Sequence, residues 1–455
     1  MNNFMKLEEI FALKTTENGD KAYSTTMNPM LDILFMSEYY SKHLDEIPMI
    51  GKSDREKLFA MMMRDPRFGL GRRELGRRLM LMTDVTPDMV VKAGRYDDLF
   101  IGWETMPDEA FANMCEYLYK EIHNGNELCK KWMPRYSSKN LMLARKIAKQ
   151  FRMNKQTYGH FIKSDTTEQK LSRHNTESIK FEQVPSLAMI KYFNRFATGE
   201  DTKERFAKYQ EDVRSGKAEL KVSTTNVYDI YKNREKIDPD LFFSKIEKIS
   251  GSWIPVVDTS GSMCDSNDSI GKAYAVGHYL AKCSSYAPDT ILSFSSHPQL
   301  LKLGVANTYQ EYYWRTSVTK TQEITEASPY MREIQSMYTG DCSNTDFGAV
   351  CEALKNLDKE NAPEWIIVLS DMEMDCGSNQ TKDEMMNIFK QNGMNTHIVW
   401  WNFNSRNTTV PETDNYGNIY MSGYSPMLLK FIKVGFDGQK FLNTLIDEYS
   451  VAINK

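Results

Sequence analysis

The 455-residue sequence has few of the residues that usually carry catalysis or zinc binding. It contains seven histidines and seven cysteines, and the cysteines stand singly, without a Cys-x-x-Cys pair or a zinc-ligand spacing. An odd number of widely spaced thiols favours reduced cysteines in a cytoplasmic setting over a disulfide framework. No nucleophile lies beside a base at a recognisable spacing, so we expect a protein without enzymatic activity.

Long apolar segments are absent as well. No run reaches the roughly 18 residues that cross a bilayer, and the first residues, Met1 to Lys6, lack the apolar core of a signal peptide. We therefore expect no membrane partner and a cytoplasmic location, which for a viral protein means the host cytoplasm or the virion. Disorder is excluded too, because 41% of the residues are hydrophobic, enough for large cores.

The small net charge of −4 conceals two halves of opposite sign. Residues 1–250 contain 42 Lys and Arg against 37 Asp and Glu, whereas residues 251–455 contain 15 against 24. A basic first half suits a phosphate-bearing or acidic partner. An acidic second half suits cation binding, although an ordinary solvated surface has the same composition.

The first half of the chain is predicted to be helical. Residues 1–29 are polar and rich in turn residues, which indicates an extended N-terminal arm with a turn at Asn18-Gly19. Residues 30–250 show apolar residues at helical spacing, with Pro87 and Pro107 at helix starts. Helices following one another in this way predict a stacked, HEAT-like helical-repeat domain.

The pattern changes at residue 251, where a second domain is expected to continue to residue 455. Apolar strands at 253–258, 290–295, 365–371 and 396–403 alternate with helical stretches at 270–284, 346–357 and 383–391. This alternation predicts a mostly parallel, doubly wound, Rossmann-like sheet with helices on both faces. The complete fold class is thus α plus α/β.

The ends of these strands carry a cation-binding pattern. The first strand runs into Asp258-Thr-Ser260-Gly-Ser262, Thr345 opens a later helix, and Asp371 ends another strand. Strand ends meet at one edge of a parallel sheet, and two carboxylates with three hydroxyls suit Mg²⁺ or another divalent cation. Helix capping by the same side chains is the alternative. Few direct carboxylates would leave the ion able to accept an acidic group from a protein partner.

Three cysteines stand close to these loops, at positions 264, 342 and 376. They could act as soft ligands or as a redox switch. We expect instead that they are reduced fillers beside tight turns.

The basic half contains two candidate phosphate-binding regions. Arginines crowd residues 64–78, and Arg73 and Arg77 share a helix face. Residues 130–195 hold fifteen Lys and Arg against four Asp and Glu, with interleaved aromatics. We expect RNA contacts from seven side chains: Arg72, Arg73, Arg77, Arg78, Lys146, Lys149 and Arg152. An arginine face paired with Asp65 and Glu74 is the alternative for the first region.

Resemblances to known families extend these expectations. The Asp-x-Ser-x-Ser loop with Thr345 and Asp371 resembles the metal-ion-dependent adhesion site of von Willebrand factor A domains. The layout of a helical module before such a domain resembles the Ro autoantigen (TROVE) architecture. Closer still is an uncharacterised family of plants and large DNA viruses, through these motifs: Thr16-Glu-Asn-Gly19, Arg64-Asp65, Gly94-Arg-Tyr-Asp-Asp-Leu99, Lys131-Trp-Met-Pro134, Val184-Pro-Ser-x-Ala-Met189 and Ser215-Gly-Lys-Ala218.

The Ro resemblance implies a ring of helical repeats, closed by the A domain, that binds structured RNA on its basic surface. The sequence therefore predicts a non-catalytic RNA-binding protein whose Mg²⁺-dependent domain closes the ring or recruits a partner. The alternative is a protein-interaction or virion-associated module in which the cation docks an acidic residue of the partner and no RNA is bound.

Overall fold

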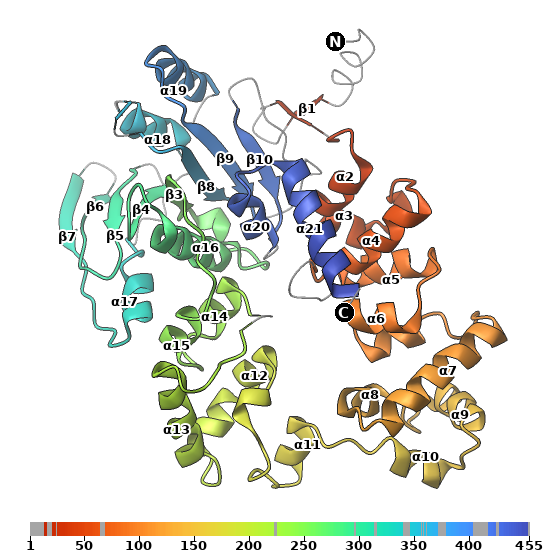
Figure 1. Cartoon of the computed structure of the whole chain (residues 1–455). Coiled ribbons are helices and arrows are strands. Elements are labelled where there is room, and N and C mark those ends of the chain that lie inside the picture. The colour runs from red at the N-terminus through yellow and green to blue at the C-terminus, as the bar shows by residue number, and fades with distance from the viewer. Residues whose placement is uncertain are drawn as a thin grey trace. The chain divides into compact units, whose positions relative to one another are not determined.

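The computed structural model describes residues 13–15, 21–23, 25–63, 69–222, 225–294, 297–313, 316–339, 346–355, 357, 359–360, 362–371, 379–403, 417–424 and 427–453. The chain forms two compact units. Unit 1 comprises residues 1–43 and 225–441, and unit 2 comprises residues 44–224 and 442–455. The helices and strands of both units are labelled in Figure 1.

The centre of unit 1 is a six-stranded sheet with the strand order β10-β9-β8-β3-β4-β5. All neighbouring strands are parallel except β4 and β5, which are antiparallel. The strands are β3 (Trp253–Asp258), β4 (Thr290–Phe294), β5 (Leu300–Lys302), β8 (Trp365–Ser370), β9 (His397–Asn402) and β10 (Ile419–Ser422).

Helices cover both faces of this sheet (Figure 1). One face carries Ile254, Val256 and Val368 and forms a buried core with α18 (Phe347–Leu354) and α19 (Asn379–Gln391). On the opposite face, α16 (Ser269–Cys283) contacts β3 through Gly277, where a Cβ would lie 2.6 Å from the Val257 side chain. Because both faces are buried, the strands have continuous apolar sequences.

Unit 1 also contains further helices and two small hairpins. The helices are α14 (Val227–Asn233), α15 (Pro239–Phe243), α17 (Pro329–Gln335), α20 (Met427–Lys433) and the start of α21 (Gly438–Ile453), with a short 3₁₀ turn, η4 (Gly261–Met263). The hairpins are β1 (Leu13–Thr15) with β2 (Lys21–Tyr23), and β6 (Thr308–Tyr313) with β7 (Thr316–Thr321).

The N-terminal helices also belong to unit 1. Helices α2 (Pro29–Phe35) and α3 (Ser37–Lys42) fall on the sheet side of the division. The Phe35 ring packs against Phe431 of α20 at 5.1 Å and against Phe441 of α21 at 5.8 Å between centroids. This division differs from the expected domain boundaries at residues 29/30 and 250/251. Contacts between residues about 400 positions apart place α2 with the sheet, and the local periodicity of a sequence does not reveal such contacts.

Unit 2 consists of helices joined by short turns. The helices are α4 (Lys52–Met62), α5 (Arg73–Leu81), α6 (Pro87–Ala93), α7 (Asp108–His123), α8 (Glu127–Trp132), α9 (Leu141–Gln150), α10 (Lys155–Phe161), α11 (Thr167–Ser172), α12 (Ser186–Thr198), α13 (Lys203–Arg214) and the rest of α21. The 3₁₀ turns η1 (Leu44–Glu46), η2 (Tyr96–Phe100) and η3 (Phe181–Gln183) interrupt them.

Local signals explain where several of these helices begin. Thr86 precedes Pro87, and its hydroxyl accepts from the Met89 N–H at 3.3 Å. Asn154 caps α10 by accepting from the Thr157 N–H at 2.9 Å. The predicted class, a helical first part followed by a mostly parallel α/β sheet, is therefore confirmed. Among the described helices, none has the length and apolar character needed to cross a membrane.

Candidate functional site

The candidate cation site lies at a switch point in the topology of the sheet. Strands β3 and β8 are neighbours, but the chain leaves β3 toward β4 on one side and leaves β8 toward β9 on the other. Ligands of α/β sheets bind at such a switch point, outside the carboxyl ends of the strands. Asp258 ends β3, and Asp371 directly follows β8. The sheet therefore brings together two residues that are 113 positions apart in the sequence.

Hydrogen bonds fix the Asp258 carboxylate on both sides. One oxygen accepts from the Ser260 backbone N–H at 2.9 Å, and the other accepts from the Ser370 hydroxyl at 2.6 Å. The hydroxyl oxygens of Ser260 and Ser262 lie 3.0 Å apart. Three of the predicted ligands thus meet at one strand end, and Ser370 is an orienting residue that the sequence analysis did not identify.

The environment of these groups is unfavourable for two bare negative charges. Asp258 and Asp371 are 0% and 1% exposed. Burial raises the pKa of Asp258 to about 6, hydrogen bonds from Ser370 and Ser260 oppose the rise, and the charge of Asp371 adds to it. A divalent cation placed between the carboxylates would remove this repulsion.

The residues present fit a hard divalent cation. Carboxylate and hydroxyl oxygens are the donors that Mg²⁺ prefers, and Mg²⁺ usually has one or two carboxylates and retains waters. Among the described residues, no three His, Cys, Asp or Glu side chains cluster at a possible metal site. That finding does not apply to a site built from two carboxylates and hydroxyls.

Part of the predicted site lies outside the described residues. Thr345, Cys342 and Cys376 belong to that part, so their predicted roles stay predictions. Cys264 is described as an exposed free thiol. Among the other described cysteines, Cys283 and Cys351 are buried.

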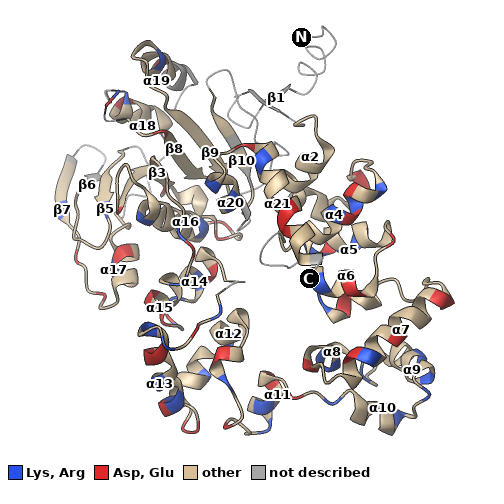
Figure 2. Cartoon of the chain, viewed as in Figure 1, with Lys and Arg blue, Asp and Glu red and all other residues tan. Residues whose placement is uncertain are grey.

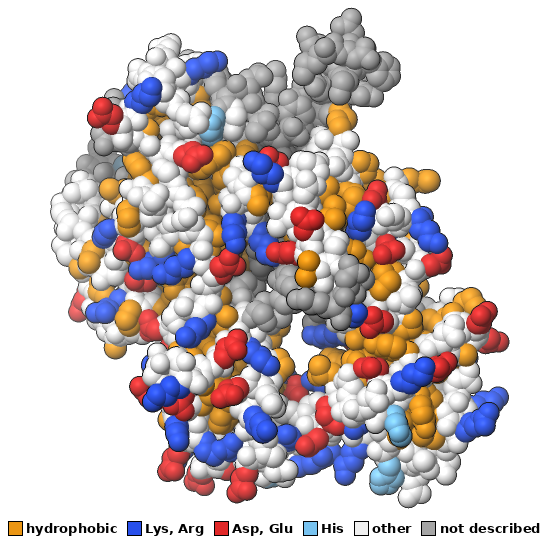
Figure 3. Space-filling view, in the orientation of Figure 1, with side chains coloured by type: hydrophobic (Ala, Val, Ile, Leu, Met, Phe, Trp, Pro, Cys, Tyr) orange, Lys and Arg blue, Asp and Glu red, His pale blue; other side chains and the backbone are white. Residues whose placement is uncertain are grey.

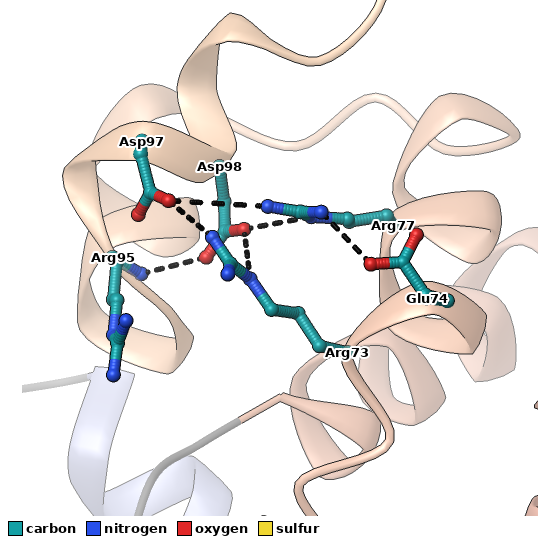
Figure 4. Close-up of polar contacts among 6 residues, drawn as sticks. All are labelled: Arg73, Glu74, Arg77, Arg95, Asp97 and Asp98. Atoms are coloured by element: carbon teal, nitrogen blue, oxygen red, sulfur yellow. Dashed lines mark hydrogen bonds and ion pairs between the residues drawn. The ribbon is translucent and has the colours of Figure 1, made fainter.

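The arginines of α5 have partners within unit 2. Arg73 pairs with Asp97 and donates from Nε to Asp98 at 2.9 Å, and Arg77 donates from Nε to the same Asp98 oxygen at 2.9 Å (Figure 4). Asp98 is fully buried at 0% exposure. Burial acts to lower the pKa of Arg73, but the bonds to both carboxylates outweigh it and raise that pKa. Arg73 and Arg77 therefore stabilise the turn at η2.

This arrangement resembles the ion-paired alternative more than the RNA-contact prediction for these two arginines. The expected partner Glu74 does accept from Arg77 at 2.9 Å, and Asp65 lies outside the described residues. Arg78 approaches Asp45 at 3.9 Å and is half exposed. Arg72 is partly buried at the start of α5.

A different surface of unit 2 offers available positive charge. Between Glu127 and Asp165 the sequence contains ten Lys and Arg and no Asp or Glu. Figure 2 shows α9 and α10 with blue and no red residues, and Figure 3 shows blue side chains on the surface over them. Seven of these side chains are exposed and form no ion pair with another described residue: Arg135, Lys139, Arg145, Lys149, Arg152, Lys155 and Lys163. We call these seven residues the α9–α10 cationic surface.

Three predicted RNA contacts lie on or beside this surface. Arg145, Lys149 and Arg152 are spaced four and three apart, so they share one side of α9 and its end. Lys146 has turned to the other side, with its ammonium 4.1 Å from the centroid of Phe111 and 3.8 Å from Asp108. The sequence analysis missed Arg145, although the same spacing rule identifies it.

Four of the eight aromatic residues in residues 130–195 are buried. Tyr158 is 0% exposed, and its hydroxyl donates to the Pro134 carbonyl at 2.9 Å. Phe151, Phe181 and Phe193 are likewise buried. These four rings are therefore not available to stack on bases, whereas Trp132, Tyr136, Phe161 and Tyr192 are partly exposed.

Comparisons with known proteins give similarities without an assigned activity. Residues 112–241 match a domain of unknown function (DUF2828), and residues 252–443 match a second domain of unknown function (DUF7788). The chain is 23% identical over 506 residues to the uncharacterized protein L728 of Acanthamoeba polyphaga mimivirus, covering 92% of this chain and 84% of that protein. This similarity agrees with the expected relation to proteins of large DNA viruses.

One similar solved structure is that of the Deinococcus radiodurans Ro (RSR) protein. It is 12% identical, with a TM-score of 0.38 over 87% of this chain and 84% of that chain. At this TM-score the likeness does not establish a shared fold. The ring and the von Willebrand factor A assignment therefore stay predictions.

Proposed function

We propose that the protein is a non-catalytic binding protein whose sheet unit holds a divalent cation, Mg²⁺ in the cell, and presents it to an acidic group of a protein partner. The supporting observation is the meeting of Asp258 and Asp371, both almost completely buried, beside two serine hydroxyls at the switch point of the sheet. Two carboxylates buried close together are costly without a compensating cation.

The choice of ligands supports binding over catalysis. Hydroxyl groups neutralise less of the cation's charge than carboxylates do, so the ion retains affinity for another oxygen ligand. A carboxylate from a partner supplies such an oxygen and matches the preference of Mg²⁺. The acidic character of residues 251–455 favours cation accumulation near this edge.

Calorimetric titration with Mg²⁺ tests the proposal directly. Wild-type protein is expected to bind one cation, and Asp371→Asn is expected to abolish the binding. Glu364→Gln is the matched control, because this exposed carboxylate lies at the amino end of the same strand region. If wild type takes up no Mg²⁺ or Mn²⁺, or if both variants lose binding equally, the proposal is wrong.

A second function is favoured by the α9–α10 cationic surface, which we propose binds the phosphate backbone of RNA. Its charges are exposed and have no ion-pair partner among the described residues, and Arg145, Lys149 and Arg152 follow one another along α9 and its end. Because the charges are exposed while the nearby rings of Phe151 and Tyr158 are buried, recognition rests on phosphate charge more than on base stacking. The expected binding is therefore weakly dependent on sequence and strongly dependent on salt.

Filter binding of a structured RNA at two salt concentrations tests this second proposal. Lys149→Gln and Arg152→Gln should each weaken binding to all sequences and reduce the salt slope by about one. Lys120→Gln is the control, since this lysine is already paired with Glu116 at 2.6 Å. Absence of binding by wild type at about 50 mM salt, where phosphate contacts are strongest, would leave an acidic protein partner as the ligand.

A further inference from the structure

Helix α14 connects the cation loop, residues 258–268, to the point where the chain enters unit 1. The chain crosses from unit 2 to unit 1 between residues 224 and 225, directly before Asn226. Asn226 caps α14 by accepting from the Asp229 N–H at 3.0 Å. In the first turn of the helix, the Tyr228 hydroxyl donates to the Asp268 carboxylate at 2.7 Å. The start of α14 is therefore bonded to the end of the cation loop.

A second contact holds the same turn at the carboxyl edge of the sheet. Tyr424, which follows β10, donates from its hydroxyl to the Asn226 side chain at 3.0 Å. The rings of Tyr228 and Tyr424 pack edge to face with centroids 5.6 Å apart. Residues from the loops after β3 and β10 thus both fix the orientation of Tyr228.

Asp268 has a backbone conformation that requires support. Its φ of 55° and ψ of 47° lie in the left-handed region, which is unfavourable for most residues. Its carboxylate occupies the space beside Gly271, where a Cβ would come within 2.5 Å of an oxygen. Burial raises the pKa of Tyr228, and the bond to Asp268 raises it further, so the hydroxyl remains a donor at neutral pH.

Turns connect Asp268 to the proposed cation ligands. The Met263 N–H donates to the Ser260 carbonyl at 3.3 Å, and the Asp268 N–H donates to the Asp265 carbonyl at 3.1 Å. Asp265 also accepts from the Ser269 N–H at 2.9 Å, which attaches the loop to α16. Through these hydrogen bonds, a shift of Asp268 moves the loop that carries the serine hydroxyls.

We propose that Tyr228 is a positioning residue for the cation site and that α14 responds to cation binding. This inference rests on the proposed cation-binding function. The Tyr228 hydroxyl holds the loop in the conformation that aligns Ser260 and Ser262, and a bound cation favours the same conformation. Because such coupling is reciprocal, the cation stabilises the Tyr228–Asp268 bond by the same factor by which the bond strengthens cation binding.

Two measurements on Tyr228→Phe test the coupling in the full-length protein. In a Mg²⁺ titration, we expect the affinity to fall about fivefold or more, the usual lower range for coupled sites. In hydrogen exchange, Mg²⁺ should slow the amides of Val227–Asn233 in wild type and not in this variant. Tyr231→Phe is the matched control on the same helix, because its hydroxyl bonds Tyr338 at 2.9 Å and not the cation loop.

Variants of Asp268 separate positioning from general loss of structure. Asp268→Asn keeps an oxygen acceptor and tolerates the left-handed conformation, so its affinity for Mg²⁺ should remain near that of wild type. Asp268→Ala should bind as weakly as Tyr228→Phe.

The outcomes distinguish the inference from the function on which it rests. If wild type binds no Mg²⁺ or Mn²⁺, the cation-binding function itself fails. If wild type binds and Tyr228→Phe binds equally well, or Mg²⁺ leaves the exchange of α14 unchanged, the coupling is overturned while the cation site stands. Equal weakening by Tyr231→Phe would likewise overturn it.

Discussion

Replacing Asp258 with asparagine should stabilise the cation-free protein and abolish its response to Mg²⁺. The carboxylate is completely buried beside Asp371, and burial raises its pKa to about 6. Asparagine removes the charge at nearly constant volume. Its carbonyl oxygen can still accept from the Ser260 N–H, and its amide can donate to the Ser370 hydroxyl.

The magnitude follows from the pKa. A rise from the usual value near 4 to about 6 corresponds to roughly 3 kcal/mol of preference for the neutral form. Because the pKa of Asp258 is higher in the folded than in the unfolded state, this group does not destabilise the cation-free protein at a pH below its unfolded-state pKa. The protein then loses stability as the pH rises through about 6. At pH 7 the full cost is present, and Asp258→Asn should recover about 1 to 3 kcal/mol of it.

Scanning calorimetry in EDTA and in Mg²⁺ measures both effects. In a unit of this size each kcal/mol changes Tm by roughly 2 to 4 °C, so the variant should melt several degrees above wild type in EDTA at pH 7. At pH 5 the difference should shrink, because wild type is then protonated. Mg²⁺ should raise the Tm of wild type and of Glu364→Gln only. A variant that melts lower than wild type in EDTA, or that Mg²⁺ still stabilises, would refute the electrostatic reasoning.

Three further predictions concern stability and reactivity. Asp98→Ala leaves two guanidinium groups without their buried acceptor and should lower the free energy of unfolding in urea by about 3 to 5 kcal/mol. The control Glu74→Ala removes an exposed carboxylate and should lower it by under about 1 kcal/mol. Equal losses in the two variants would contradict the central role of Asp98. Burial lowers the pKa of His278 despite its bond to a carboxylate. The folding stability that the neutral imidazole contributes should therefore be fully present above about pH 6.5 and should decrease as the pH drops through the lowered pKa of the folded state. If His278→Gln leaves the pH dependence of unfolding unchanged, this prediction is contradicted. Alkylation of the folded protein, followed by mass spectrometry, should label the exposed Cys264 first and leave Cys115 unlabelled, because burial raises the pKa of the Cys115 thiol to about 12. Equal labelling of the two cysteines would contradict this prediction.

Strands β3, β4, β8 and β9 could be predicted closely because both of their faces are buried, whereas the short edge strand β5, whose outer two residues are exposed, was not predicted. Residues 253–258 and 365–371 are continuous apolar runs, and the structure places β3 and β8 there. The hairpin of β6 and β7 was not predicted, because residues 308–321 mix polar and aromatic residues without a clear period. Its strands are specified by pairing with each other, which single-strand patterns do not reveal.

The candidate cation site was largely predictable for a different reason. Asp258, Ser260 and Ser262 lie within one turn, so their proximity follows from chain connectivity alone. Asp371 joins them because parallel strands end at the same edge of a sheet. Ser370 and Tyr228 could not be identified, since their roles depend on the register of β3 with β8 and on the placement of α14.

The sequence could not predict which positive side chains are free to bind a ligand. The availability of a positive side chain depends on which anions reach it, and for Arg73 and Arg77 these are Asp97 and Asp98, more than twenty positions away in another element. Neither the spacing of the arginines nor their local charge surplus reveals that pairing. Along α9 and α10 the nearest acidic residues in sequence, Glu127 and Asp165, lie outside the segment, so local pairing cannot neutralise its central charges. A long run without the opposite charge is therefore better support for a free binding surface than a dense cluster is.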